Sequence, residues 1–179
     1  MEKEYLDIVD EKNNLTGEKV LRSEAHAKGI WHRVVHIYLF RKNQGEIEFI
    51  VHMRSKFKDL YPNAWDTRFG GHIKSGTSIK EAVDSELKDE IGIEINQKNL
   101  IEGPLHKIDD FPNCELAKAY FFEYVGNIND LKFDDGEVQE VKWMNIQEIK
   151  KSMEKEADKW ADDLPGFEKV SNCLINKEK

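Results

Sequence analysis

Three acidic residues on one predicted helix are the side chains best placed to do chemistry in this chain. The helix is expected over residues 78–91, and each residue turns it by about 100°. Glu86 and Glu90 then fall among apolar residues that face a core, and Asp89 lies at their edge. The apolar residues of that face are Ile79, Ala82, Val83, Leu87 and Ile91. Because buried carboxylates are costly without a positive partner, this arrangement indicates a divalent cation.

Local signals mark both ends of this helix. Ser78 and Glu81 have the spacing of a capping box, and Gly92 is suited to end the helix. A glycine-rich segment at residues 70–76 precedes the cap and offers free backbone groups to a ligand. An alternative is a charged helix whose acids reach solvent at a rim, since runs of charge are usually solvated. The close spacing of three like charges favours the cation, because it destabilises a helix without one.

The composition indicates one soluble globular domain. The chain has 179 residues, of which 39% are apolar and 35% charged, and this length allows a sizeable core. A net charge of −8 argues against nucleic acid as a partner, although metal ions would still let phosphates bind. The sequence has no apolar run long enough to predict a membrane span, and the first residues do not resemble a signal peptide. We expect a cytoplasmic protein that binds neither nucleic acid nor membranes, and the sequence leaves a homodimer open.

The cysteine content agrees with that location. The chain has two cysteines, Cys114 and Cys173, which lie far apart in the sequence. Isolated cysteines of this kind are typical of reduced thiols rather than of a disulfide framework.

Alternating and apolar segments predict the strands that would position the acidic helix. The expected strands cover residues 5–9, 33–41, 47–53, 117–125 and 137–144. Asn43, Gln44 and Gly45 form a turn, so the second and third strands should pair as a hairpin. The third strand is expected to be half-buried. Its alternating sets are Ile47, Phe49, Val51 and Met53 against Glu48, Ile50 and His52.

Two further helices are expected after the last strand. Asn145 and Glu148 form a second capping box. Pro165 is suited to the first turn of a helix over residues 165–175. Strands combined with a helix in mid-chain and helices at the end predict a mixed β-sheet between helical layers, an α/β/α sandwich.

Residues 71–93 resemble the Nudix box, a loop and helix with glycine, glutamate and arginine at fixed spacings. Its positions are filled by Gly71, Glu86, Leu87, Asp89, Glu90, Gly92 and Ile93. Thr77 stands where the first glutamate is expected, and Ser85 stands where the arginine is expected. In the family that pair helps to bind the loop to the helix. Because both charges are absent together, a neutral hydrogen bond between Thr77 and Ser85 is expected to replace the ion pair.

The resemblance extends beyond the box to a subgroup that contains isopentenyl-diphosphate isomerases and isomerase-like diphosphate hydrolases. The matching segments include residues 5–10, 24–26, 29–36, 54–56, 65–66 and 70–72. The resemblance implies a single Nudix-type α/β/α sandwich over residues 1–179. Residues 1–30 would be an N-terminal extension packed on that domain.

The activity that the resemblance implies is metal-dependent hydrolysis of a diphosphate bond in a small molecule X–P–P–Y. The substrate would be a nucleotide, isoprenoid or cofactor diphosphate. Glu86, Asp89 and Glu90 would bind Mg²⁺ or Mn²⁺, and the carbonyl of Gly71 would be a further ligand. The metal would lower the pKa of a water molecule, which Glu90 or Glu86 would orient or deprotonate.

Residues outside the box are also candidates for the site. Glu137 or Glu140, at the start of the last predicted strand, would be an alternative base. The competing interpretation is a solvated turn after Asp134, Asp135 and Gly136.

Basic residues near the glycine-rich segment are candidates for phosphate binding. Arg54, Lys56, Lys58 and Arg68 would clamp phosphate oxygens, and the alternative is an exposed basic loop. His72 in the loop is expected to contact the substrate.

Two other functions stay open. Isopentenyl-diphosphate isomerases need a catalytic cysteine just before the Gly-His of the loop, and this chain has Gly70 there. Allylic isomerisation requires a group that protonates carbon, whereas hydrolysis does not, so hydrolysis is favoured. A catalytically silent module that binds diphosphates is supported by the departures at Thr77 and Ser85.

Histidines form a further candidate metal site by the same resemblance. His26, His32, His72 and Glu115 lie in regions corresponding to those that hold a metal in the isomerases. Asn113 stands where the isomerases have another glutamate. The alternative is that these histidines make ordinary hydrogen bonds in the fold.

Overall fold

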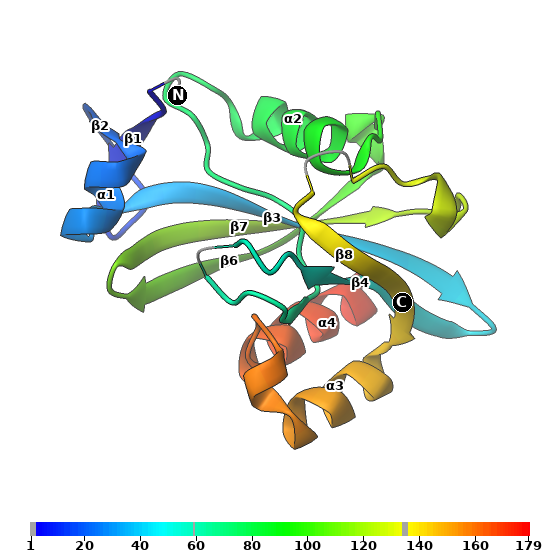
Figure 1. Ribbon diagram of the computed structural model, residues 1–179. Helices are drawn as coiled ribbons and strands as arrows, with labels where there is room; N and C mark the ends of the chain where they lie inside the picture. The colour runs from blue at the N-terminus through cyan, green and yellow to red at the C-terminus, as the bar shows by residue number, and fades with distance from the viewer. Residues whose placement is uncertain (1–2, 59, 134–135) are drawn as a thin grey trace.

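A mixed β-sheet between two helical layers forms the centre of the computed structural model, which describes residues 3–58, 60–133 and 136–179 (Figure 1). The sheet has the order β5-β4-β3-β7-β6, and β8 also pairs with β4. Its strands are β3 (His32–Asn43), β4 (Glu46–Arg54), β5 (Trp65–Asp66), β6 (Leu100–Asp110), β7 (Asn113–Glu123) and β8 (Val138–Asn145). The pair β3–β7 is parallel and the other pairs are antiparallel, which confirms the predicted mixed sheet and the β3–β4 hairpin.

Helices cover both faces of this sheet. The helix α2 (Ile79–Ile91) lies on one face, and α3 (Ile146–Lys155) and α4 (Leu164–Lys177) lie on the other (Figure 1). Both predicted capping boxes are present, one at Ser78 and one at Asn145. Pro165 lies in the first turn of α4, as expected. Within the described residues, short 3-10 helices lie at Gln97–Asn99, Ile128–Asp130 and Ala157–Lys159.

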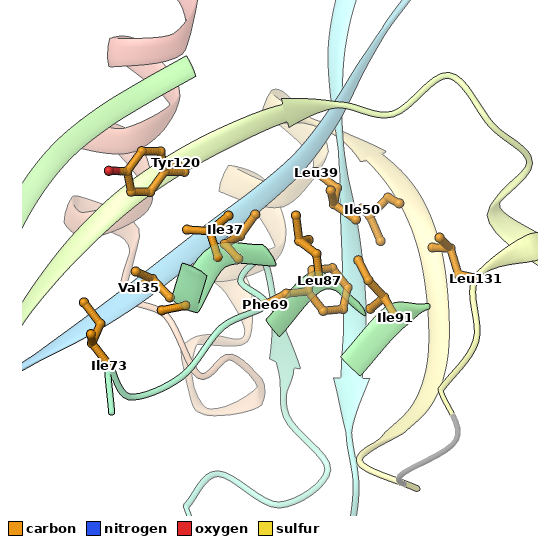
Figure 2. Close-up of a cluster of buried hydrophobic side chains, with 12 residues drawn as sticks. Val35, Ile37, Leu39, Ile50, Phe69, Ile73, Leu87, Ile91, Tyr120 and Leu131 are labelled. Atoms are coloured by element: carbon orange, nitrogen blue, oxygen red, sulfur yellow. The ribbon is translucent and has the colours of Figure 1, made fainter. Parts of the chain in front are cut away.

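Alternation along β3 divides the core between the two layers. Ile37 and Leu39 form one cluster with Leu87 and Ile91 of α2 (Figure 2). Tyr38 and Phe40 point the other way and pack against α3 and α4. Each large apolar side chain that is buried in this way contributes about 1.5–3 kcal/mol. The apolar face of α2 is therefore fixed against the sheet, and this decides where its acids can point.

The expectation that the strand at residues 47–53 is half-buried was wrong. Phe49, Ile50, Val51 and His52 of β4 are all buried. The strand lies in the interior of the sheet and has a helical layer on each face, so both of its faces are covered.

The N-terminal unit, residues 3–31, is a small structure of its own. The strands β1 (Tyr5–Val9) and β2 (Leu15–Leu21) form a two-stranded antiparallel sheet, and α1 (Arg22–Lys28) follows them. Leu6, Val20 and Ala25 are its buried core. In Figure 1 this unit lies beside the green segment that leads into α2.

Two further findings bear on the expectations from composition. Over the residues described, each helix is too short or too polar to cross a membrane. Cys114 and Cys173 are free thiols, and the first is buried.

Candidate active site

The glycine loop, residues 70–77, runs along β3 before it reaches α2. Val35 N donates a hydrogen bond of 2.9 Å to Gly71 O, and Ile73 N donates one of 3.0 Å to Arg33 O. Gly70 has a φ of +134°, and a Cβ built on it would lie 2.1 Å from Val35 O. Because only glycine fits there, the loop backbone can lie directly against β3.

Glu86 and Glu90 reach this loop from α2. Gly70 N donates a hydrogen bond of 3.0 Å to Glu90 Oε2. A Cβ on Gly71 would lie 2.8 Å from Glu86 Oε1, so the missing side chain leaves room for the carboxylate. Burial raises the pKa of Glu90 to about 8, and it raises that of Glu86 to about 7 despite the charge of Lys74. Two partly desolvated carboxylates at one loop fit a divalent cation.

The third acid of the predicted trio differs from the other two. Asp89 is exposed, and its Oδ2 accepts a hydrogen bond of 2.9 Å from Ser85 Oγ. The hydroxyl of Ser85 therefore bonds to Asp89. The sequence had predicted that it would bond to Thr77. Metal binding by Asp89 and by the carbonyl of Gly71 stays a prediction.

A small cavity of about 50 Å³ borders Glu90. Its walls include three of the predicted basic residues and one of the predicted bases, namely Arg54, Lys58, Arg68 and Glu137. Two other candidates lie elsewhere. Lys56 is exposed and its Nζ stacks over the ring of Phe57, and Glu140 is exposed on β8. This polar cavity lies between β4, β8, α2 and the loop.

Ion pairs hold the charged walls of this cavity. Lys58 pairs with Glu137, and Arg54 NH1 lies 3.1 Å from Asp66 Oδ2. Glu137 is partly buried, while Asp134 and Asp135 of the competing solvated turn lie outside the described residues.

Arg68 forms ion pairs with two carboxylates. Its Nε lies 3.1 Å from Asp66 Oδ1 and 2.7 Å from Asp162 Oδ1. Burial opposes the charge of Asp66, but Arg68, His52 and Arg54 together lower its pKa. These contacts give Arg68 a structural role, and its part in substrate binding stays a prediction.

Sequence reasoning missed two buried residues of this region, His52 and Asp66. Both lie on the strand pair β4–β5, where they are direct partners. Burial lowers the pKa of His52 to about 4, and the ring stacks on Phe69 with centroids 4.5 Å apart. The position of His52 between Val51 and Met53 gave only a strand signal.

A second cluster of metal-ligating side chains lies around His72, which directly follows Gly71 in the loop. His26, His32, His72 and Glu115 each offer a ligand atom, and these atoms all lie within 4.8 Å of one another. The residues come from α1, β3, the glycine loop and β7, and the parallel register pairs His32 with Glu115. His26 Nε2 and His72 Nε2 are 2.9 Å apart. We call this group the histidine cluster.

The chemistry of the histidine cluster fits a metal ion. Burial lowers the pKa of His72 to about 3 and also lowers that of His26, so both rings are neutral near pH 7. His32 Nδ1 lies 2.8 Å from Ile30 O, which leaves Nε2 as the free ring nitrogen. Within the part of the chain that the structure describes, this buried Nε2 has no hydrogen-bond partner. A buried nitrogen without a partner is costly, and a bound cation would satisfy it.

Asn113 supports the cluster from outside. Its Oδ1 lies 3.2 Å from His26 Nδ1, so Nε2 of that ring is directed at the other ligands. His72, predicted to contact the substrate, is instead seen within the cluster, and its contact with a substrate stays a prediction.

Comparisons with known proteins agree with this geometry. Residues 30–164 match the family model described as the NUDIX domain. The chain is 33% identical over 162 residues to an uncharacterized Nudix hydrolase of Clostridium acetobutylicum, covering 88% of this chain and 78% of that protein. A crystal structure from Deinococcus radiodurans has the same fold, with a TM-score of 0.72 over 95% of this chain and 99% of the other, at 24% identity.

Similarity to an isomerase is weaker. The chain is 24% identical over 159 residues to the isopentenyl-diphosphate Delta-isomerase of Aliivibrio fischeri, with 87% of each protein covered. This match agrees with the predicted subgroup, which stays a prediction.

Proposed function

The chain belongs to the Nudix hydrolase family, and on that premise we propose that it is a metal-dependent diphosphatase acting on a small molecule X–P–P–Y. Members of the family act in general on nucleoside diphosphate derivatives. One observation carries the proposal. Glu86 and Glu90 meet the glycine loop, and the cavity beside Glu90 is lined by Arg54 and Lys58.

The carboxylates of α2 would hold the metal. Glu86 and Glu90, with Asp89 and the carbonyl of Gly71, offer the oxygen ligands that Mg²⁺ and Mn²⁺ prefer. When bound, the cation supplies neutralisation of phosphate charge and a lowered pKa for water. The raised pKa of both glutamates supports this assignment, because burial opposes their charge more than Lys74 near Glu86 and Lys58 near Glu90 favour it.

Side chains around the cavity have distinct parts in the reaction. Glu90, oriented by the amide of Gly70, would accept a proton from water or orient it. Arg54 and Lys58 would bind phosphate oxygens. Since Lys58 pairs with Glu137, a phosphate bound by Lys58 would lie close to Glu137, the alternative base. Glu140 and Lys56, which do not line this cavity, would act only by contact with the rest of the substrate.

Arg68 would contribute by positioning. It holds one oxygen of Asp66, and Asp66 presents its other oxygen to Arg54. This chain of ion pairs orients Arg54 toward the cavity before a phosphate arrives. Preorganised charge of this kind costs little reorganisation when the substrate binds.

The histidine cluster favours a second bound metal. Imidazole nitrogens with one carboxylate suit Zn²⁺ or Mn²⁺, and His72 connects this site to the glycine loop. The same cluster is also consistent with the isomerase alternative. That alternative is disfavoured because Gly70 occupies the position of the proton donor, and any Cβ there would collide with Val35 O.

A substrate panel tests the proposed function. Nucleoside, isoprenoid and cofactor diphosphates are incubated with the protein and Mg²⁺ or Mn²⁺, and the phosphate esters formed by cleavage are separated and measured, together with any inorganic phosphate. We expect one class to be cleaved and Glu90→Gln to lower kcat at least about 100-fold. Glu94→Gln is the matched control, because Glu94 is exposed just beyond the end of α2.

Three results would contradict the proposal. The first is a complete panel left intact in the presence of metal. The second is double-bond migration in isopentenyl diphosphate, which would indicate an isomerase. The third is tight binding of a diphosphate without turnover, which would indicate a silent module.

A further inference from the structure

We propose that Asp7, on the N-terminal strand β1, is a positioning residue that holds the glycine loop in place for metal binding. The proposal rests on the function proposed above, since the loop carries Gly71 against Glu86. In the family, the residues at positions 77 and 85 help to bind the loop to the helix. The proposal gives the role of holding the loop in this chain to the N-terminal unit.

Both carboxylate oxygens of Asp7 are engaged by the end of the loop. Ser75 Oγ donates a hydrogen bond of 2.6 Å to Asp7 Oδ1, and Gly76 N donates one of 3.2 Å to Asp7 Oδ2. Hydrogen bonds to an ionised carboxylate are stronger than those between neutral groups. A single side chain thus fixes two successive residues of the loop.

The backbone of β1 adds to this attachment. Ser75 N donates a hydrogen bond of 2.7 Å to Tyr5 O, and Leu6 pairs with Lys74 as an antiparallel bridge. Leu6 is fully buried in the core of the N-terminal unit, which fixes β1 itself. Figure 1 shows β1 next to the segment that climbs toward α2. Asp7 is therefore presented to the loop from a rigid element.

The same unit holds the start of the loop. His26 of α1 contacts His72, with the two Nε2 atoms 2.9 Å apart. Gly71, which lies against Glu86, precedes His72 directly. The segment between His72 and Ser75 is thus held at both ends by the N-terminal unit. A displacement at Ser75 would reach Gly71 through only three intervening residues.

The two box positions that depart from the family pattern, Thr77 and Ser85, do not anchor the loop to α2. Ser85 directs its hydroxyl to Asp89, and Thr77 N donates a hydrogen bond of 3.0 Å to Lys74 O within the loop. Neither contact joins the loop to α2. The charged acceptor that holds the loop is instead the carboxylate of Asp7 on β1.

Titration of the full chain with Mn²⁺, followed by electron paramagnetic resonance after one equivalent of Zn²⁺ has been added to fill the histidine cluster, tests the proposal. We expect Asp7→Ala to weaken Mn²⁺ binding about tenfold, as for other residues that orient metal ligands, and Ser75→Ala to weaken it about threefold. Asp10→Ala is the matched control, because Asp10 bonds Lys12 and Asn14 of its own turn. Its Mn²⁺ affinity should stay within about twofold of the wild type.

A rescue experiment separates positioning from general stability. Thr77→Glu with Ser85→Arg restores the family pair, so it should return Mn²⁺ affinity to the Asp7→Ala protein and add little to the wild type. Ser75→Ala keeps the test valid if Asp7→Ala does not fold. Wild-type affinity in both single variants, or a loss that the pair does not restore, would overturn the proposal.

Hydrogen exchange distinguishes this failure from failure of the proposed function. Without metal, Asp7→Ala should speed exchange at the amides of Ser75 and Gly76, and Asp10→Ala should not. Unchanged exchange would reject the anchor. If Glu90→Gln binds Mn²⁺ as the wild type does while exchange responds to Asp7→Ala, the proposed metal site fails and the anchor stands.

Discussion

Glu90 lies in surroundings that oppose its charge. Its carboxylate is partly buried, receives one backbone hydrogen bond, and has Glu86 as a neighbour of like charge. Burial and the charge of Glu86 raise its pKa to about 8, although the hydrogen bond from Gly70 favours the charged form. In the metal-free protein the folded state thus binds a proton that the unfolded state releases at lower pH. A site prepared for a cation costs stability until the cation arrives.

This cost predicts that Glu90→Gln stabilises the metal-free protein at pH 8. A carboxyl with a raised folded-state pKa contributes stability that is present below its unfolded pKa, near 4.5, and is lost as pH rises toward 8. The glutamine cannot ionise, so we expect a gain of about 1–3 kcal/mol at pH 8 and little difference at pH 5. Urea unfolding in EDTA at both pH values measures this difference.

The control for this prediction is Glu94→Gln. Glu94 is exposed and pairs with Lys88 at 3.1 Å, so its removal should change stability by less than about 1 kcal/mol at either pH. A gain in Glu90→Gln that is equal at pH 5 and pH 8 would exclude the titration as its cause.

At the scale of elements, the two glycines at the start of the loop have different requirements. A Cβ on Gly70 would meet the backbone of β3, and its φ of +134° is unsuited to other residues. The atoms nearest to a Cβ on Gly71 would be those of the Glu86 carboxylate, the first at 2.8 Å, and a side chain can move. Gly70 therefore serves the fold, and Gly71 serves the site.

Alanine at each position separates these roles. We expect Gly70→Ala to lower the free energy of unfolding by about 2–4 kcal/mol, because β3 and the loop must separate. Gly71→Ala should change it by less than about 1 kcal/mol and weaken Mn²⁺ binding at least about tenfold. Thermal unfolding and Mn²⁺ titration of both variants check this, and the reverse assignment of losses would contradict it.

Elements with local signals could be predicted, and those without such signals could not. The capping residues Ser78 and Asn145 mark α2 and α3 because they bond to amides three residues away. In contrast, α1 begins after Leu21 without a side-chain cap, and a shift in register between Glu102 and Leu105 interrupts β6. These elements depend on tertiary contacts and were missed.

The prediction of the site from the sequence was limited in the same way. Glu86 and Glu90 could be placed on α2 from helical spacing alone. The partner of Arg68, Asp162, belongs to the segment between α3 and α4, and nothing in the local sequence pairs them. Arg68 was therefore considered as a phosphate ligand, and its buried ion pairs came only from the fold.

At the scale of the whole molecule, the histidine cluster joins parts that are distant in sequence. Its ligands come from the N-terminal unit, the central strand β3, the glycine loop and β7. The contacts of the N-terminal unit with the rest of the chain include Arg33 with Asn13, and Asp7 with Ser75. An ion bound by the cluster would add a cross-link between α1 and the sheet.

This arrangement predicts that Zn²⁺ or Mn²⁺ stabilises the fold independently of the carboxylates on α2. By mass action, a metal at 100 times its Kd adds about 2.7 kcal/mol. We expect added Zn²⁺ to raise the Tm of the wild type and of Glu90→Gln alike, and to slow hydrogen exchange in α1.

The variant His26→Asn should lose both effects, because it removes the ligand that α1 supplies. His106→Asn is the matched control, since His106 lies on β6 outside the cluster. A rise in Tm that survives His26→Asn but is lost in Glu90→Gln would assign the ion to α2 and leave the N-terminal unit held by hydrogen bonds and packing.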